Sequence, residues 1–150
     1  MGGGGSRARS RGYRAERELV ATLWRLGFAV MRAPASGARI KRADYPDIVA
    51  IKDGKVLVLE VKRRSEVANI YIDSEQYSKL MNFAKRAGGK AYIAIKIPYR
   101  EWVFIDASKL ERLSSGKYRV SKEDINNGLR LGDVLKQLGI KVGIEEFMSD

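Results

Sequence analysis

The chain has 150 residues, the size of one domain, and contains neither cysteine nor histidine. These absences exclude disulfides, thiolate nucleophiles, cysteine-ligated zinc and serine–histidine triads, so any catalysis must use carboxylates, lysine, arginine or hydroxyls with a hard metal ion. The formal charge of +11 indicates a polyanionic partner, with nucleic acid the first candidate and an anionic membrane surface the second. No apolar run approaches the roughly 20 residues that span a bilayer, and the first residues do not form a secretory signal, so we expect an intracellular protein.

The first third of the chain predicts one helix and one strand. Residues 1–10 are rich in glycine and arginine without periodicity, so we expect a flexible basic arm there. A helix is predicted over residues 13–27, because apolar side chains recur at helical spacing and Gly27 can end it. A short strand at 28–32 and a long loop at 33–46 follow.

The middle of the chain predicts a hairpin. Two apolar, β-branched runs at residues 47–52 and 55–62 predict strands, and Asp53-Gly54 between them is typical of a two-residue hairpin turn. Both faces of these strands are apolar over most of their length. We therefore expect the strands at the centre of a sheet that is covered on both sides.

The second half of the chain predicts a helix that Ser74 caps and Gly88-Gly89 ends, two strands, and two weaker helices. These elements are expected at residues 74–87, 90–97, 101–106, 107–113 and 129–138. The element order predicts a single α/β domain at residues 11–150, with a central mixed five-stranded sheet flanked by helices.

The hairpin brings two acids together. Because a two-residue turn fixes the register, Asp47 should face Glu60 with Cβ atoms about 4.5–5.5 Å apart, and Lys62 should lie on the same face. Opposed carboxylates repel each other, and a divalent cation would remove that conflict, with the Val61 carbonyl as a further oxygen ligand. Lys62 could then orient an attacking water or stabilise charge on a phosphate. The alternative is a pair of ordinary strand-end acids, each paired with a basic residue.

A third acid comes from the first predicted helix. At 100° per residue, Glu16 falls inside the apolar stripe that includes Trp24, while Glu18 points to the opposite side. A core-facing glutamate costs about several kcal/mol unless it is paired or binds metal, so we expect Glu16 to approach the two hairpin acids. The alternative is that Glu16 complements the positive end of the helix dipole or is reached by water.

Basic residues flank these acids in the sequence and predict contacts with a nucleic-acid backbone, which carry no base code. They are Arg7, Arg9, Arg11, Arg14, Arg17, Arg32, Arg39, Lys41, Arg42, Arg63 and Arg64. The alternative for each of them is a solvated surface charge.

The spacing of Pro46-Asp47, twelve residues, and Glu60-Val61-Lys62 resembles that of the PD-(D/E)xK nuclease superfamily. More closely, the chain is similar to the archaeal Holliday junction resolvases. The residues that carry this likeness are Arg14 to Leu19, Gly27 to Arg32, Ala33 to Gly37, Pro46 to Ala50, Leu59 to Lys62, Ala94 to Lys96 and Trp102 to Phe104. The first ten residues and the tail after about Gly116 match no pattern of that family.

The resemblance implies a restriction-endonuclease-like fold and a magnesium-dependent endodeoxyribonuclease, in which manganese can substitute. Such an enzyme resolves four-way junction DNA by paired symmetric nicks during recombination and repair. The implied catalytic and metal-site residues are Glu16, Asp47, Glu60 and Lys62, with functional side chains at Arg17, Arg32 and Ser36.

The resemblance also implies a homodimer in the cytoplasm at the nucleoid, with branch-migration or sliding-clamp proteins as candidate partners. Residues 92–97 and 102–105 are candidates for the dimer interface, and the alternative is that both are core strands. Two other functions stay open: a repair, restriction-like or flap nuclease of the same superfamily, or a DNA-binding protein without activity. The complete set of three acids and a lysine disfavours the latter.

Overall fold

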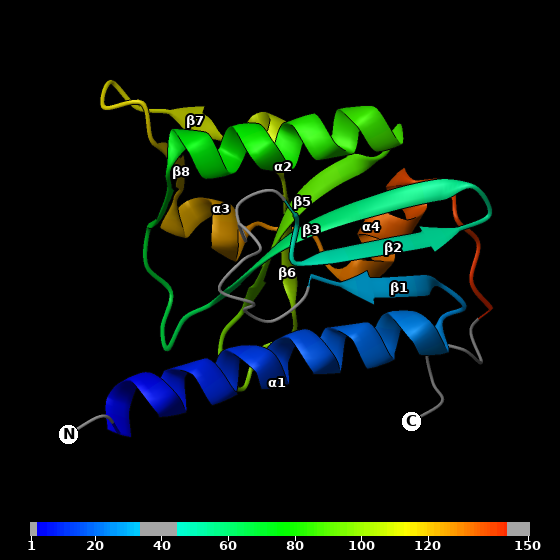
Figure 1. Ribbon diagram of the computed structural model, residues 1–150, viewed down its shortest axis with the longest axis horizontal. Coiled ribbons are helices and arrows are strands. Elements are labelled where there is room, and N and C mark those ends of the chain that lie inside the picture. The colour runs from blue at the N-terminus through cyan, green and yellow to red at the C-terminus, as the bar shows by residue number, and fades with distance from the viewer. Residues whose placement is uncertain (1–2, 34–44, 144–150) are drawn as a thin grey trace.

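The computed structural model describes residues 3–33 and 45–143. Its centre is a five-stranded sheet in the order β1-β2-β3-β5-β6 (Figure 1), in which β3 and β5 run parallel and the other neighbours antiparallel. These strands are β1 (Ala29–Arg32), β2 (Ile48–Lys52), β3 (Lys55–Arg63), β5 (Lys90–Lys96) and β6 (Val103–Asp106). The predicted α/β class and the mixed five-stranded sheet are confirmed.

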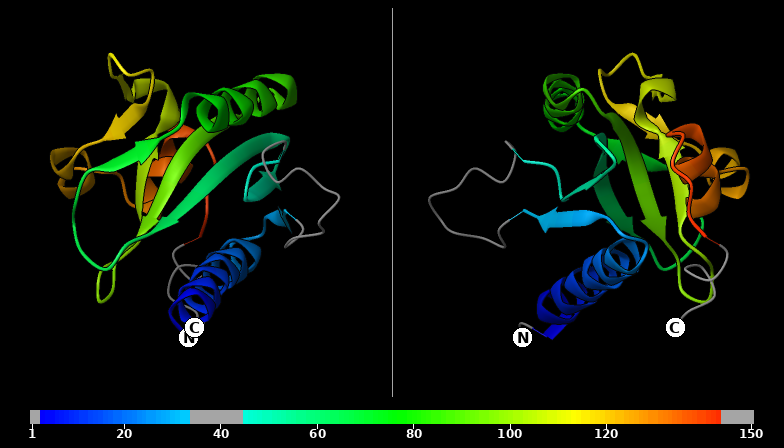
Figure 2. Two further views of the ribbon diagram at one scale, coloured as in Figure 1. Left: turned by 60° about the vertical axis from the view of Figure 1, so that its left-hand side comes forward. Right: turned by 90° about the vertical axis from the view of Figure 1, so that its right-hand side faces the viewer.

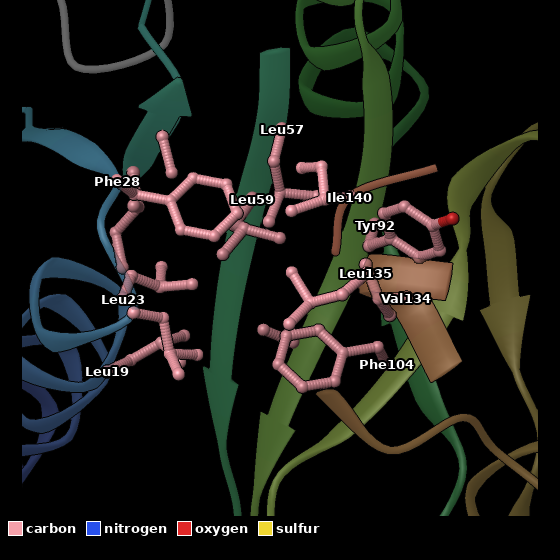
Figure 3. Close-up of a cluster of buried hydrophobic side chains, with 14 residues drawn as sticks. Leu19, Leu23, Phe28, Leu57, Leu59, Tyr92, Phe104, Val134, Leu135 and Ile140 are labelled. Carbon is pink, nitrogen blue, oxygen red and sulfur yellow. The ribbon is translucent and has the colours of Figure 1, made fainter. Parts of the chain in front are cut away.

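Helices cover both faces of this sheet. α1 (Gly3–Arg25) and α4 (Leu131–Gln137) pack on one face, and α2 (Ser74–Ala87) packs on the other. Side chains alternate along β3, so Leu57 and Leu59 enter the core with α1 and α4 while Val58 enters the core beneath α2. Figure 3 shows the first of these cores, in which Leu59 of β3 lies between Leu19 and Leu23 of α1 and Val134 and Leu135 of α4, all on the same face of the sheet. The double cover explains why β3 is apolar on both faces.

The β2–β3 turn has the geometry that its sequence predicts. Asp53 and Gly54 have φ values of 52° and 76°, and positive φ at both central residues is what a type I′ hairpin turn requires. The register runs from Lys52 opposite Lys55 to Ile48 opposite Leu59. The register predicted from the two-residue loop is confirmed.

α1 differs from its prediction in two ways. It begins at Gly3 rather than near residue 13, so it takes in most of the segment expected as an arm. Trp24 is 65% exposed and lies outside the core, since the buried stripe is centred on Leu19 and Leu23. Glu16 is therefore at the flank of that stripe. None of the described helices is long and apolar enough to cross a membrane.

A second, smaller sheet was not predicted. It has three strands in the order β4-β8-β7, and the short helices η2 and α3 lie beside them in the sequence. These elements are β4 (Ile70–Ile72), η2 (Ala107–Lys109), β7 (Glu111–Arg112), β8 (Tyr118–Val120) and α3 (Lys122–Asn126). Segments of two to five residues show no usable periodicity, and tertiary contacts hold them, such as the stacked rings of Tyr77 and Tyr118 with centroids 3.6 Å apart.

Gly89 provides a test of how tightly α2 is joined to the sheet. A Cβ at this position would lie 2.5 Å from the carbonyl oxygen of Val56, whereas a Cβ on Gly132 of α4 would meet nothing within 4 Å. We expect Gly89→Ala to lower the free energy of unfolding by about 1–3 kcal/mol, because backbone must move. Gly132→Ala should be neutral or stabilise by up to about 1 kcal/mol, because alanine is the better helix former. Urea unfolding of both variants would check this, and equal effects would contradict it.

Candidate active site

The predicted acids meet at the end of the β2–β3 hairpin. Asp47 directly precedes β2, and one step beyond the Ile48–Leu59 pair the register places it opposite Glu60. The Val61 amide donates a hydrogen bond to Oδ2 of Asp47 at 2.8 Å. The strand pairing fixes the backbone of Asp47 opposite Glu60, and the hydrogen bond from Val61 fixes the Asp47 carboxylate. This carboxylate therefore has little freedom to turn away from Glu60.

Glu60 lies in an unfavourable environment for a charge. Its side chain is 8% exposed, and Gln76 of α2 donates a hydrogen bond to its Oε1 at 3.1 Å. Burial, followed by the neighbouring Asp47 carboxylate, raises the pKa of Glu60 from 4.5 to about 9; Glu16 adds to this rise and Lys62 opposes it. The protein alone therefore favours a protonated Glu60 at neutral pH.

A single cavity of about 520 Å³ contains the predicted site. Its lining comes from α1, the start of β2, the end of β3 and the first turns of α2. The lining residues are Glu16, Tyr45, Pro46, Asp47, Glu60, Val61, Lys62, Asp73, Glu75, Gln76, Lys79 and Leu80. The structure thus brings together the three acids and the lysine that the sequence singled out.

The donor atoms of this cavity suit a hard cation. Carboxylate oxygens of Asp47 and Glu60 and the Val61 carbonyl are the ligand type that magnesium prefers, and magnesium commonly uses only one or two carboxylates with waters and phosphate. Within residues 3–33 and 45–143, no three acidic side chains converge closely enough to enclose a metal on their own. Glu16 shares the cavity and its electrostatic field, without joining the other two acids in a closed cage.

Sequence reasoning missed Gln76. This residue lies one and two helical turns before the buried Leu80 and Ala84, so it belongs to the stripe of α2 that faces the sheet. A polar residue in an apolar stripe was the signal used for Glu16, and it would have identified Gln76 as well. The predicted cap of this helix was also one residue late, because Asp73 occupies the N-cap position in place of Ser74.

The structure places only some of the predicted DNA contacts. Arg14, Arg17, Arg32 and Arg64 are exposed, and Arg63 is partly exposed on β3 beside the site. Other candidates lie in the N-terminal part of α1 or outside the described residues. These are Arg7, Arg9 and Arg11 in the helix, and Ser36, Arg39, Lys41 and Arg42 in the segment outside.

The two segments considered for a dimer interface belong largely to the core. Tyr92, Ile95 and Phe104 are fully buried within the single chain, between α2 on one face and α1 and α4 on the other. The apolar side chains of these two segments are therefore explained by the alternative, that both segments are core strands.

Comparisons with known proteins identify the family of this chain and agree with its fold. The family model described as archaeal Holliday junction resolvase (Hjc) matches residues 7–142, so the expectation that the tail after about Gly116 matches no pattern of that family is wrong for residues up to 142. A crossover junction endodeoxyribonuclease Hjc from Sulfurisphaera tokodaii is 39% identical over 135 residues, covering 89% of this chain and 92% of the relative. The protein of the same name from Sulfolobus acidocaldarius is 33% identical over 142 residues, covering 93% and 98%.

A solved structure gives the same answer for the fold. Archaeoglobus fulgidus Hjc, described as a Holliday junction resolvase from an archaeal hyperthermophile, superposes with a TM-score of 0.73 at 31% identity. The match covers 89% of this chain and 99% of that structure, so the likeness extends over the whole domain. Because the family model matches most of this chain, the chain belongs to the archaeal Holliday junction resolvase family.

Proposed function

We propose that this chain is a metal-dependent endodeoxyribonuclease that resolves four-way DNA junctions by paired symmetric nicks. The observation that carries the proposal is the pair of facing acids, Asp47 and Glu60, held on a rigid hairpin with Lys62 on the same face of one cavity. Relatives that cover nearly the whole chain are named crossover junction endodeoxyribonucleases, which supports the assignment of the substrate.

Asp47, Glu60 and the Val61 carbonyl would hold the metal, which we assign to magnesium, with manganese able to substitute. When bound, a divalent cation polarises the scissile phosphate and lowers the pKa of a water. Burial and repulsion by Asp47 favour a proton on Glu60. The positive charge of the cation, added to that of Lys62, would allow both facing carboxylates to stay ionised. Glu16 shares the cavity and would add a third negative charge that favours a bound cation.

The remaining residues position the reacting groups. The ammonium of Lys62, whose charge already acts on Glu60, orients the attacking water and stabilises the negative charge that develops on the phosphate. Water adds to phosphorus as one phosphorus–oxygen bond breaks, and the departing oxygen takes a proton, which leaves a nick. Gln76 holds the Glu60 carboxylate in place through its hydrogen bond.

Arginines around the cavity would hold the DNA strand. Arg17 and Arg32 are exposed on α1 and β1, and Arg63 follows Lys62 directly on β3. Contacts of this kind neutralise phosphates without reading bases, which suits recognition of a branched shape. Arg32 and Ser36 would also contact the scissile phosphate group.

One active site makes one nick, so resolution needs two copies of the chain related by two-fold symmetry. We propose a homodimer on these grounds. Branch-migration and sliding-clamp proteins stay predictions as partners.

Removal of one metal ligand gives the most direct test of the site. We expect Asp47→Asn to lower junction cleavage at least about 100-fold, because the carboxylate charge is lost, while junction binding survives. The matched control is Glu18→Gln on the exposed side of α1, which should cleave like the parent. Persistent cleavage by Asp47→Asn would show that the metal is held elsewhere.

Substrate choice is tested with a four-way junction and a duplex of the same sequence, each incubated with magnesium or manganese. Paired nicks confined to the junction are expected. Equal cutting of both substrates would favour a repair or restriction-like nuclease of the superfamily, and binding without cutting would favour a DNA-binding protein without activity.

The raised pKa of Glu60 makes stability depend on pH in the metal-free protein. The folded state keeps a proton that the unfolded state releases, so the free energy of unfolding should fall between pH 4.5 and about pH 9, by up to about 1.4 kcal/mol per pH unit from this group. Glu60→Gln should remove that slope. Urea unfolding in EDTA at several pH values would compare the two proteins, and identical slopes would contradict the assignment. Metal binding should release the proton and strengthen as pH rises.

A further inference from the structure

The turn between β5 and β6 holds an aromatic residue in a strained conformation. The Arg100 amide donates a hydrogen bond to the Ile97 carbonyl at 3.1 Å, so residues 97–100 form a β-turn with Pro98 and Tyr99 at its centre. Tyr99 has a φ of 64°. Proline at the first central position followed by positive φ at the second defines a type II turn, in which glycine or asparagine is expected and a bulky residue is an outlier.

This turn is anchored at its base. Ile97 is buried, and Trp102 packs against the core between the sheet, α1 and α4. The ammonium of Lys96 also donates a hydrogen bond to the Arg100 carbonyl. These contacts fix the backbone on both sides, so the strain at Tyr99 is imposed by surroundings that determine the turn.

The Tyr99 side chain does not pack against the rest of the described chain, although the backbone of its turn is held in place. Its exposure is 106% of the reference value, the highest among the large apolar and aromatic side chains of the described residues. The ring is therefore fully exposed to solvent, while the backbone that carries it is held in place by the contacts of the turn. Tyr99 thus combines an unfavourable positive φ with an aromatic ring that does not contribute to the core. Such a combination allows a binding role to be inferred.

The turn lies at the same end of the sheet as the active site, where the C-terminal ends of β3 and β5 lie side by side. β3 and β5 are parallel, with Lys62 opposite Ile95 and Arg63 opposite Lys96, and the Arg64 amide donates to the Lys96 carbonyl at 3.1 Å. Tyr99 follows Ile95 by four residues, which places its backbone about 10 Å beyond the level of Lys62. In Figure 2 (left) this turn projects from the end of the sheet.

The charge around Tyr99 identifies the chemistry of its partner. Lys96 and Arg100 flank it in the turn, and Arg63 and Arg64 lie on the neighbouring strand end. Aromatic rings set among basic side chains are the arrangement by which proteins stack on nucleobases while holding the phosphate backbone. A base inside a continuous duplex offers no free face, whereas base pairs at the centre of a four-way junction do.

We propose that Tyr99 is a stacking contact for the exposed face of a base pair at the branch point of a DNA junction, and that the strained turn holds its ring ready for that contact. The inference rests on the proposed function and deepens it, because it assigns the preference for branched over continuous DNA to a named residue. The contact places the branch point beside the strand that enters the Asp47–Glu60 cavity.

The test measures binding without magnesium, so that no substrate is cut. The full chain and its variants are compared on a four-way junction, a duplex and a single strand of the same sequence. Tyr99→Gly should weaken junction binding by about 5- to 150-fold and leave duplex binding unchanged, which is the range for loss of one base stack. Tyr99→Phe should bind the junction like the parent, because the ring is kept. Trp24→Ala is the matched control: it removes an exposed aromatic ring from the last turn of α1 and should bind like the parent.

Two further readouts separate stacking from charge and from misfolding. Tyr99→Gly should raise the melting temperature by about 2–4 °C, because glycine accepts positive φ, so weaker binding could not be attributed to unfolding. It should leave the slope of log affinity against log salt unchanged, whereas Arg100→Gln should reduce that slope by about one. Fluorescence of 2-aminopurine at the branch point should change on binding the parent but not Tyr99→Gly.

Several outcomes would overturn the inference. Unchanged junction affinity of Tyr99→Gly would do so, as would equal losses on junction and duplex, or a loss seen only on the single strand. Failure of the proposed function looks different: the parent itself would then show no preference for the junction over the duplex, and Tyr99→Gly would have no preference to remove.

Discussion

Two carboxylates that repel each other are kept face to face by a backbone that cannot relax. The type I′ turn at Asp53 and Gly54 sets the register of β2 and β3, and the register sets Asp47 against Glu60. The Val61 amide then fixes the Asp47 carboxylate from the partner strand. In a looser loop the two acids would separate and become solvated, so the ladder is what keeps two mutually repelling carboxylates close together.

The rest of the domain supplies the rigidity that this arrangement needs. β3 is buried on both faces, with Leu57 and Leu59 packed beside α1 and α4 and Val58 beneath α2. The same alternation that buries Val58 carries Glu60 to the α2 face, where Gln76 meets it. Burial of Glu60 and its raised pKa are thus consequences of where β3 lies, since any side chain at that position would be covered.

The sequence predicted those parts of the site that depend on short-range geometry. A two-residue turn allows only one register, so the positions of Asp47, Glu60 and Lys62 followed from counting. The position of Glu16 beside the apolar stripe followed from the 100° rotation per residue along one helix. It holds even though Trp24 lies outside the stripe. Gln76 carried the same kind of signal, a polar residue in line with Leu80 and Ala84, but its partner comes from a different element.

The unpredicted parts depend on contacts between distant segments. β4, β7 and β8 contain three, two and three residues. The β4–β8 pairing joins distant segments, as in Ile70 opposite Val120, 50 positions later. No local pattern encodes such a pairing. The start of α1 is a different case: its three glycines disfavour a helix by local propensity, and α1 nevertheless begins at Gly3.

The topology also implies an order of assembly. The hairpin closes a loop of two residues, whereas the parallel β3–β5 pair joins Leu57 to Lys90 and needs the whole crossover through α2. Closing the longer loop costs more chain entropy, which favours early formation of the hairpin and late docking of α2. The acids can therefore meet while Glu60 is still open to water, and only the late arrival of α2 and Gln76 desolvates it.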